Sequence, residues 1–179
     1  MITSLITAIA ALSLSYVFAD SALHKFSSPQ YFRAALDNYR VVPKLLLRPL
    51  GHSLPLIEVA LAIGLLIPSM RGVTLLGMAF LLSAYTAGMA INILRGRADI
   101  DCGCSGPMQA EGLSPWLLAR NVIFLFMVAW VEFRSESLPS NVSTWFLALG
   151  GTVVLVLFYQ SLHQLGANNK LQQKVHNHG

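Results

Sequence analysis

Charged residues are scarce in this chain. Asp, Glu, Lys and Arg make up 11% of its 179 residues, whereas soluble globular domains contain about 25%. Apolar residues make up 55%. So few charges cannot cover a water-facing surface, which excludes an ordinary soluble enzyme, and so much apolar content excludes a disordered chain. The net charge is +4, but the basic residues are too few and too scattered for a phosphate-binding face, which argues against a nucleic-acid partner.

Cysteine is also scarce. The chain contains two cysteines, which is too few for the disulfide framework of a small secreted domain. Internal repeats and low-complexity tracts are lacking as well. What remains is a chain dominated by long apolar runs, with its two cysteines only one residue apart at positions 102 and 104.

Five apolar runs are candidates for crossing a membrane, whose hydrocarbon core of about 30 Å needs roughly 20 apolar residues. They cover residues 2–19, 54–67, 73–94, 115–131 and 144–162. The sequence therefore predicts an all-α membrane protein with one helical-bundle domain over residues 1–163. A polar tail over residues 164–179 is expected to fray. The first run is expected to stay as an uncleaved helix, because no basic residues precede it as they would in a signal peptide.

The segment between the first two runs, residues 25–53, has a different pattern. Its aromatic and apolar side chains approximate one helical stripe with charged residues interleaved. The stripe consists of Phe26, Tyr31, Phe32, Ala35, Leu36 and Tyr39. This pattern predicts an amphipathic helix that lies in the membrane interface and is broken at residues 41–43.

The residues best suited to chemistry are Cys102 and Cys104, in the loop between the third and fourth runs. Two thiols this close can be oxidised to an intramolecular disulfide, and Gly103 gives the backbone freedom that the small ring requires. Such a disulfide is readily reduced, which suits a transferable bond. One cysteine forms a mixed disulfide with a partner and the second cysteine resolves it.

Two other interpretations of the cysteines stay open, namely inert thiols and half of a metal site. A metal site needs two more soft ligands, and His24 and His52 could supply them only if the fold brought them close, so no metal is predicted. Asp99 and Asp101 would raise the pKa of a neighbouring thiol. Nearby arginines and the start of the fourth run would lower it, so the sequence leaves the balance open.

Ionisable residues in or beside the predicted spans form a second group of site candidates. Glu58 and Arg120 each lie about one turn inside a span, on the cysteine side of the membrane, where a lone charge is costly. We expect them to pair or to face a polar cavity beneath the cysteines, in one cluster with Asp20 and His24. The alternative is that all four side chains reach out to the lipid headgroups.

The orientation rules conflict. Nine basic residues fall on the cysteine side and two on the other, so the positive-inside rule would place the cysteines in the cytoplasm. Disulfide chemistry, however, belongs in an oxidising compartment. Five of the nine lie within residues 25–53, where an interfacial helix can attract anionic headgroups on either face. We expect the cysteine loop to be periplasmic.

The cysteine loop resembles that of a known family. Asn-Ile-Leu-Arg-Gly-Arg at residues 92–97, followed by Asp-Ile-Asp-Cys-Gly-Cys-Ser-Gly at residues 99–106, is similar to the signature loop of the MauE methylamine utilisation membrane proteins. Three earlier segments, within residues 24–32, 39–43 and 54–64, fit the same family and also resemble the broader DoxX-like membrane proteins. The resemblance covers roughly residues 10–135.

This resemblance implies a function in the maturation of methylamine dehydrogenase, a periplasmic enzyme whose small (beta) subunit carries several disulfides and a tryptophan-derived quinone. The implied process is disulfide formation, processing or transport of that subunit at the cell inner membrane. The implied active pair is Cys102 and Cys104, working with a thioredoxin-like partner, MauD. Asp20, His24, Glu58, Arg120, Asp99 and Asp101 would form the polar cluster that supports the pair.

The position of the pair also resembles the vitamin K epoxide reductase bundle, where the redox pair opens the fourth helix on the periplasmic side. This chain lacks the second cysteine pair that such enzymes often use as an internal shuttle. A partner thiol protein is therefore expected, with quinone as the candidate electron acceptor. Two alternatives remain, a non-catalytic membrane scaffold or transport component and a DoxX-like subunit of a membrane oxidoreductase.

Overall fold

The computed structural model describes residues 2–97, 100–103, 112–134 and 142–177, with only the backbone of residue 145 and of residues 162–177. Over these residues the chain is helical apart from its connections and one isolated antiparallel bridge between Asp101 and Gly112. Five of the helices are long and apolar enough to cross a membrane. The predicted all-α membrane fold is confirmed.

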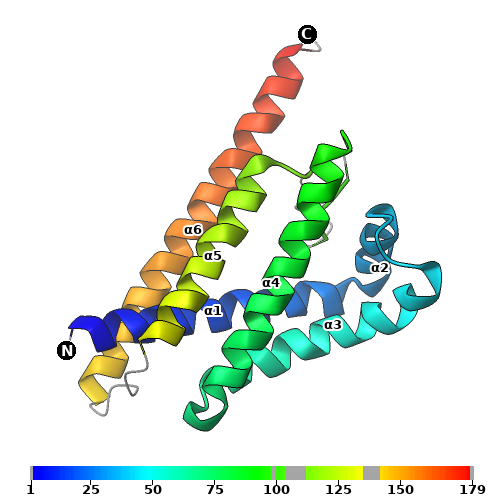
Figure 1. Ribbon diagram of the computed structural model, residues 1–179. Helices are drawn as coiled ribbons and strands as arrows, with labels where there is room; N and C mark the ends of the chain where they lie inside the picture. The colour runs from blue at the N-terminus through cyan, green and yellow to red at the C-terminus, as the bar shows by residue number, and fades with distance from the viewer. Residues whose placement is uncertain (1, 98–99, 104–111, 135–141, 178–179) are drawn as a thin grey trace.

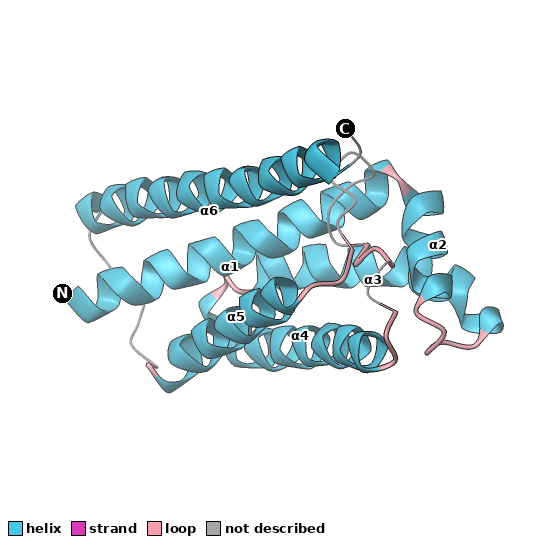
Figure 2. Cartoon of the chain, turned by 90° about the horizontal axis from the view of Figure 1, so that it is seen from above, coloured by secondary structure: helices cyan, strands magenta, loops and turns pink. Residues whose placement is uncertain are grey.

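The bundle is built around its first helix. In chain order the elements are α1 (Ile2–Ser27), α2 (Pro29–Asn38), α3 (Lys44–Gly64), the short 3-10 helix η1 (Pro68–Met70), α4 (Arg71–Leu94), α5 (Pro115–Phe133) and α6 (Val142–Asn177) (Figure 1). Helix α1 packs against α3, α5 and α6, and α4 packs against α3 and α5. Seen from above, α1 lies between α6 on one side and α5 on the other (Figure 2).

Three helix boundaries differ from the sequence prediction. Helix α1 ends at Ser27 rather than at residue 19, because Lys25 is satisfied inside the bundle and so does not end the buried helix. Helix α3 begins at Lys44 rather than at residue 54, and it runs through two prolines, whose missing N–H groups membrane helices tolerate. Helix α6 continues to Asn177. Residues 164–177 of the polar tail that was predicted to fray are helical, because lysine, leucine and glutamine are good helix formers.

The amphipathic stripe predicted after the first span falls mostly in α2, although Phe26 belongs to α1 and Tyr39 follows the last residue of α2. The buried residues of α2 are Phe32 and Ala35, and the helix packs against α3 and α1. Pro29 stands in its first turn, where a missing N–H costs nothing. Arg40, with a φ of 49°, then turns the chain toward α3. Helix α2 lies at one end of α1 and α3 (Figure 1), with its apolar residues Phe32 and Ala35 buried.

The core of the bundle lies between α1, α3, α4 and α5. Its central members include Leu14, Phe18, Ala62, Met78 and Val128. Large apolar side chains also face outward on α4, α5 and α6. Leu76, Phe80, Phe126 and Phe146 are between 69% and 74% exposed. Soluble proteins rarely expose so much apolar surface, whereas this is the surface that a multi-pass membrane protein presents to lipid.

Candidate functional site

The cysteine loop joins α4 to α5, and residues 100–103 are the part of it that the structure describes. The backbone N–H of Arg97 donates to the carbonyl of Asn92 at 2.9 Å and closes the end of α4. On the α5 side, the N–H of Leu113 donates to the carbonyl of Ile100 at 3.0 Å. The end of α4 is therefore capped, and Ile100 is held to Leu113, two residues before α5 begins.

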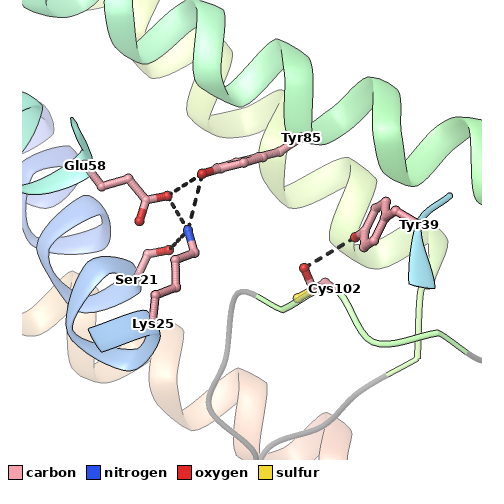
Figure 3. A network of polar contacts seen from close by, with 6 residues as sticks. All are labelled: Ser21, Lys25, Tyr39, Glu58, Tyr85 and Cys102. Atoms are coloured by element: carbon pink, nitrogen blue, oxygen red, sulfur yellow. Dashed lines mark hydrogen bonds and ion pairs between the residues drawn. The ribbon is translucent and has the colours of Figure 1, made fainter. Parts of the chain in front are cut away.

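Helix α2 and the residue that follows it hold the loop from the side. The hydroxyl of Tyr31 donates to Oδ2 of Asp101, and the hydroxyl of Tyr39 donates to the carbonyl of Cys102 at 3.4 Å (Figure 3). The other carboxylate oxygen of Asp101 accepts the N–H of Gly103 at 2.9 Å. Burial, and then the hydrogen bond to Asp101, raises the pKa of Tyr31. Tyr31 therefore stays a protonated donor at neutral pH.

Gly103 lies directly against α2. Its φ is 70°, in the left-handed region that favours glycine. A Cβ at this position would come within 3.0 Å of the Cβ of Ala35 and within 3.4 Å of the Phe32 ring. Both the backbone conformation and the space therefore require glycine between the two cysteines.

Cys102 is buried, with 9% of its surface exposed. It belongs to a small apolar cluster with Met89, Leu113 and Leu117, so the α4 and α5 helices surround it. Cys104 and Asp99, the neighbours that the sequence also singled out, lie outside the described residues.

A buried ion pair lies where α1, α3 and α4 meet (Figure 3). The ammonium of Lys25 pairs with Oε1 of Glu58, and these residues are only 2% and 1% exposed. Lys25 Nζ also donates to the hydroxyls of Ser21, at 3.1 Å, and Tyr85, at 3.3 Å. The Tyr85 hydroxyl in turn donates to Glu58 Oε1 at 2.7 Å.

The hydrogen-bonding capacity of this Lys25–Glu58 cluster is almost fully used. The three N–H groups of Lys25 meet three acceptors, and Glu58 Oε1 accepts twice. Within the part of the chain that the structure describes, Glu58 Oε2 is buried without a hydrogen-bond partner. Lys25 Nζ also lies 5.1 Å from the ring centroid of Phe32 and 4.8 Å from that of Tyr85, within cation–π range.

Of the two arrangements expected for Glu58 and Arg120, direct pairing is not the one found, because Glu58 pairs with Lys25 of α1. Arg120 is nevertheless buried, at 9% exposure, and its guanidinium donates to the hydroxyl of Tyr159 in α6 at 3.0 Å. Both charged side chains are therefore buried inside the bundle. The Glu58 side chain points toward α1 and the Arg120 side chain toward α6. Spacing within one helix does not determine which distant helix a side chain meets.

Asp20 and His24 do not join the buried cluster. His24 Nε2 lies 3.7 Å from Asp20 Oδ2 across one turn of α1, and both side chains are nearly half exposed. Ser21 and Lys25 are also four residues apart and share a helix face. The face of α1 that carries Ser21 and Lys25 points into the bundle, whereas the sequence prediction chose the face with Asp20 and His24. The signal that could have found the inward face is a lysine one turn after a serine in an otherwise apolar helix.

The histidines considered as metal ligands have other contacts. His24 lies beside Asp20, and Nδ1 of His52 lies 3.0 Å from the carbonyl of Arg48. Among the described residues, no three His, Cys, Asp or Glu side chains gather closely enough to hold a metal ion.

The chain is similar to a group of curated proteins over most of its length. Residues 3–134 match the family described as methylamine utilisation protein MauE. The MauE of Paracoccus denitrificans is 30% identical over 160 residues, 89% of this chain and 86% of that protein. The MauE of Methylophilus methylotrophus is 35% identical over 158 residues, 85% of this chain and 81% of that protein. No solved structure matches the chain.

Proposed function

The chain belongs to the MauE family of methylamine utilisation proteins, and we propose that its part in methylamine utilisation is thiol–disulfide exchange. The substrate is the small (beta) subunit of methylamine dehydrogenase, whose maturation requires disulfides. The active pair is Cys102 and Cys104, and a thioredoxin-like protein of the MauD kind is the exchange partner. The protein acts in the inner membrane, with its cysteine loop on the periplasmic side, where disulfides persist.

The exchange is balanced in atoms and electrons. A thiolate of the substrate attacks the Cys102–Cys104 disulfide and forms a mixed disulfide, and the second substrate thiol then displaces the pair. The substrate thus loses two electrons and two protons, and the pair gains them as two thiols. The disulfide of the thioredoxin-like partner, or a quinone that becomes a hydroquinone, takes up the same two electrons and two protons and restores the pair.

The observation that carries this proposal is the held backbone at residues 101–103. Gly103 separates the two cysteines, and its φ of 70° lies in the left-handed region that favours glycine. Asp101 and Cys102 are hydrogen-bonded from the α2 side. A fixed loop favours a small disulfide ring because less conformational entropy is lost when the ring closes.

The burial of Cys102 assigns the two thiols different roles within this proposal. A thiol that is 9% exposed is poorly placed to meet a protein partner. When the thioredoxin-like partner reoxidises the pair, Cys104 therefore makes the mixed disulfide with the partner, and Cys102 resolves it. Replacing the resolving cysteine lets the mixed disulfide accumulate. Cys102→Ser is therefore expected to accumulate a covalent complex with the partner on a non-reducing gel, and Cys104→Ser is expected to accumulate none.

The proposed function is tested with the double variant Cys102→Ser/Cys104→Ser in cells that grow on methylamine. The expected result is a variant present in the membrane in normal amount and a small subunit that lacks its disulfides and yields no active dehydrogenase. Ser105→Ala, which alters the same loop without removing a thiol, is the matched control and should support normal maturation. Normal maturation in the double variant would favour a non-catalytic scaffold and overturn the exchange mechanism.

A further inference from the structure

We propose that the buried Lys25–Glu58 pair positions the cysteine loop through the ring of Phe32. Lys25 and Phe32 are then positioning residues for the thiol chemistry, so the inference rests on the proposed function. The argument follows a continuous series of contacts from the ion pair to Gly103.

The first contact in the series fixes the ammonium of Lys25. It has acceptors from three helices, namely Ser21 in its own helix, Glu58 in α3 and Tyr85 in α4. Hydrogen bonds are directional, so three of them leave the ammonium little freedom to move. The long lysine side chain, which is flexible at most surfaces, is here a rigid element of the bundle.

The second contact passes from Lys25 to α2. The Phe32 ring, in a residue that is 5% exposed, has the Lys25 ammonium 5.1 Å from its centroid. The same ring is a near neighbour of Gly103, since a Cβ there would lie 3.4 Å from Phe32 Cδ2 and 3.8 Å from Cε2. One aromatic ring therefore lies between the ion pair and the glycine that separates the cysteines.

The third set of contacts links the loop to the two sides of Phe32. Tyr31 donates to Asp101, and Tyr39, two turns further on, donates to the carbonyl of Cys102. A shift or rotation of α2 would therefore carry residues 101–103 with it. Figure 3 shows the ion-pair cluster and the Tyr39–Cys102 bond in the same region of the bundle.

Packing rather than long-range charge carries the effect. Lys25 and Glu58 have opposite charges in direct contact, so their fields largely cancel at the loop. A buried ion pair is also a poor source of stability, because well-packed apolar residues of similar volume often serve as well. What the pair offers and apolar residues do not is directional bonding that selects one arrangement of α1, α3 and α4 and places the ammonium against Phe32 of α2.

The test compares the dithiol–disulfide equilibrium of Cys102 and Cys104 in glutathione buffers, using the full chain in lipid nanodiscs. Phe32→Leu loosens the loop, lowers the effective concentration of one thiol at the other, and is expected to shift the equilibrium toward the dithiol by about tenfold. Phe18→Leu is the matched control, because Phe18 is equally buried at 3% exposure but lies in the α1 core. It should change the equilibrium less than about twofold.

A double-mutant cycle tests the route. Lys25→Met/Glu58→Met removes the cation while it keeps the volume, and it should shift the equilibrium in the same direction. Combined with Phe32→Leu it should add little, because both changes act through one ring. Additive shifts, or an equal shift in Phe18→Leu, would overturn the positioning proposal.

A second readout separates this proposal from the proposed function. In a Cys104→Ser background, Phe32→Leu should raise the alkylation rate of Cys102 several-fold and Phe18→Leu should not. A wild-type chain that forms no disulfide in any glutathione buffer would overturn the exchange function, and the alkylation rates would then decide the positioning proposal alone. Equal rates in the two variants would refute it.

Discussion

Replacing Lys25 with methionine gives the most informative prediction about stability. The substitution leaves the carboxylate of Glu58, which is 1% exposed, without its cation inside an apolar bundle. It also removes the Lys25 bonds to Ser21 and Tyr85 and the two ring contacts. Breaking a buried ion pair by removing one partner costs about 3–5 kcal/mol. We expect the lower end of this range, because Tyr85 continues to donate to Glu58 Oε1.

The double variant Lys25→Met/Glu58→Met should recover most of this loss, because the uncompensated charge is gone and the volume is filled. A residual cost of about 0–2 kcal/mol is expected from the lost hydrogen bonds. The assay is unfolding of the purified chain in detergent micelles, followed by tryptophan fluorescence. Lys44→Met, at an exposed position at the start of α3, is the control and should change the free energy of unfolding by less than about 0.5 kcal/mol. The reasoning is refuted if Lys25→Met behaves like Lys44→Met, or if the double variant is as unstable as the single.

Three further predictions concern the loop and the helix contacts. Gly103→Ala should lower the free energy of unfolding by about 1–3 kcal/mol, because it places a Cβ at a positive φ and against α2. The control is Gly72→Ala, which has open space around it and should be neutral or stabilising by up to about 1 kcal/mol. Gly151→Leu should destabilise the α1–α6 contact by about 1–3 kcal/mol, because a Cβ there would already lie 2.8 Å from Cδ1 of Ile9 in α1. Gly150→Leu should not, because nothing lies within 4 Å of a Cβ at that position. Thermal unfolding measures the Gly103/Gly72 and the Gly151/Gly150 comparisons. Burial raises the pKa of Tyr31 above its ordinary 10.0. The hydrogen bond from Tyr31 to the loop is therefore intact below pH 10 and is lost as the pH rises through the raised value. The difference in phenolate absorbance between wild type and Tyr31→Phe should titrate only above pH 10.

The spans could be predicted from the sequence because each depends on local composition. A run of apolar residues crosses a membrane whatever its neighbours are, so all five spans were found. Boundaries that depend on a partner were not. The first apolar run ends at residue 19, whereas α1 continues through Lys25, whose charge is buried beside Glu58 of α3.

The candidate site could be predicted only in part, for the same reason. Gly103 between two cysteines indicates a turn from its own chemistry, and the structure gives it a positive φ. Asp101 was considered for its effect on a thiol, whereas its two carboxylate oxygens bind Tyr31 and the N–H of Gly103. The contact with Tyr31 joins residues 70 positions apart, and no local pattern encodes such a contact.

The central claim is that Cys102 and Cys104 form a redox-active pair on the periplasmic side of the membrane. The most direct test is mass-shift labelling of intact cells with a membrane-impermeant thiol reagent, with and without an impermeant reductant. The account predicts that the protein becomes labelled in intact cells once the reductant is added, Cys104 before the buried Cys102, and that most of the protein is unlabelled without it. Labelling that appears only after lysis, or full labelling without any reductant, would contradict the account.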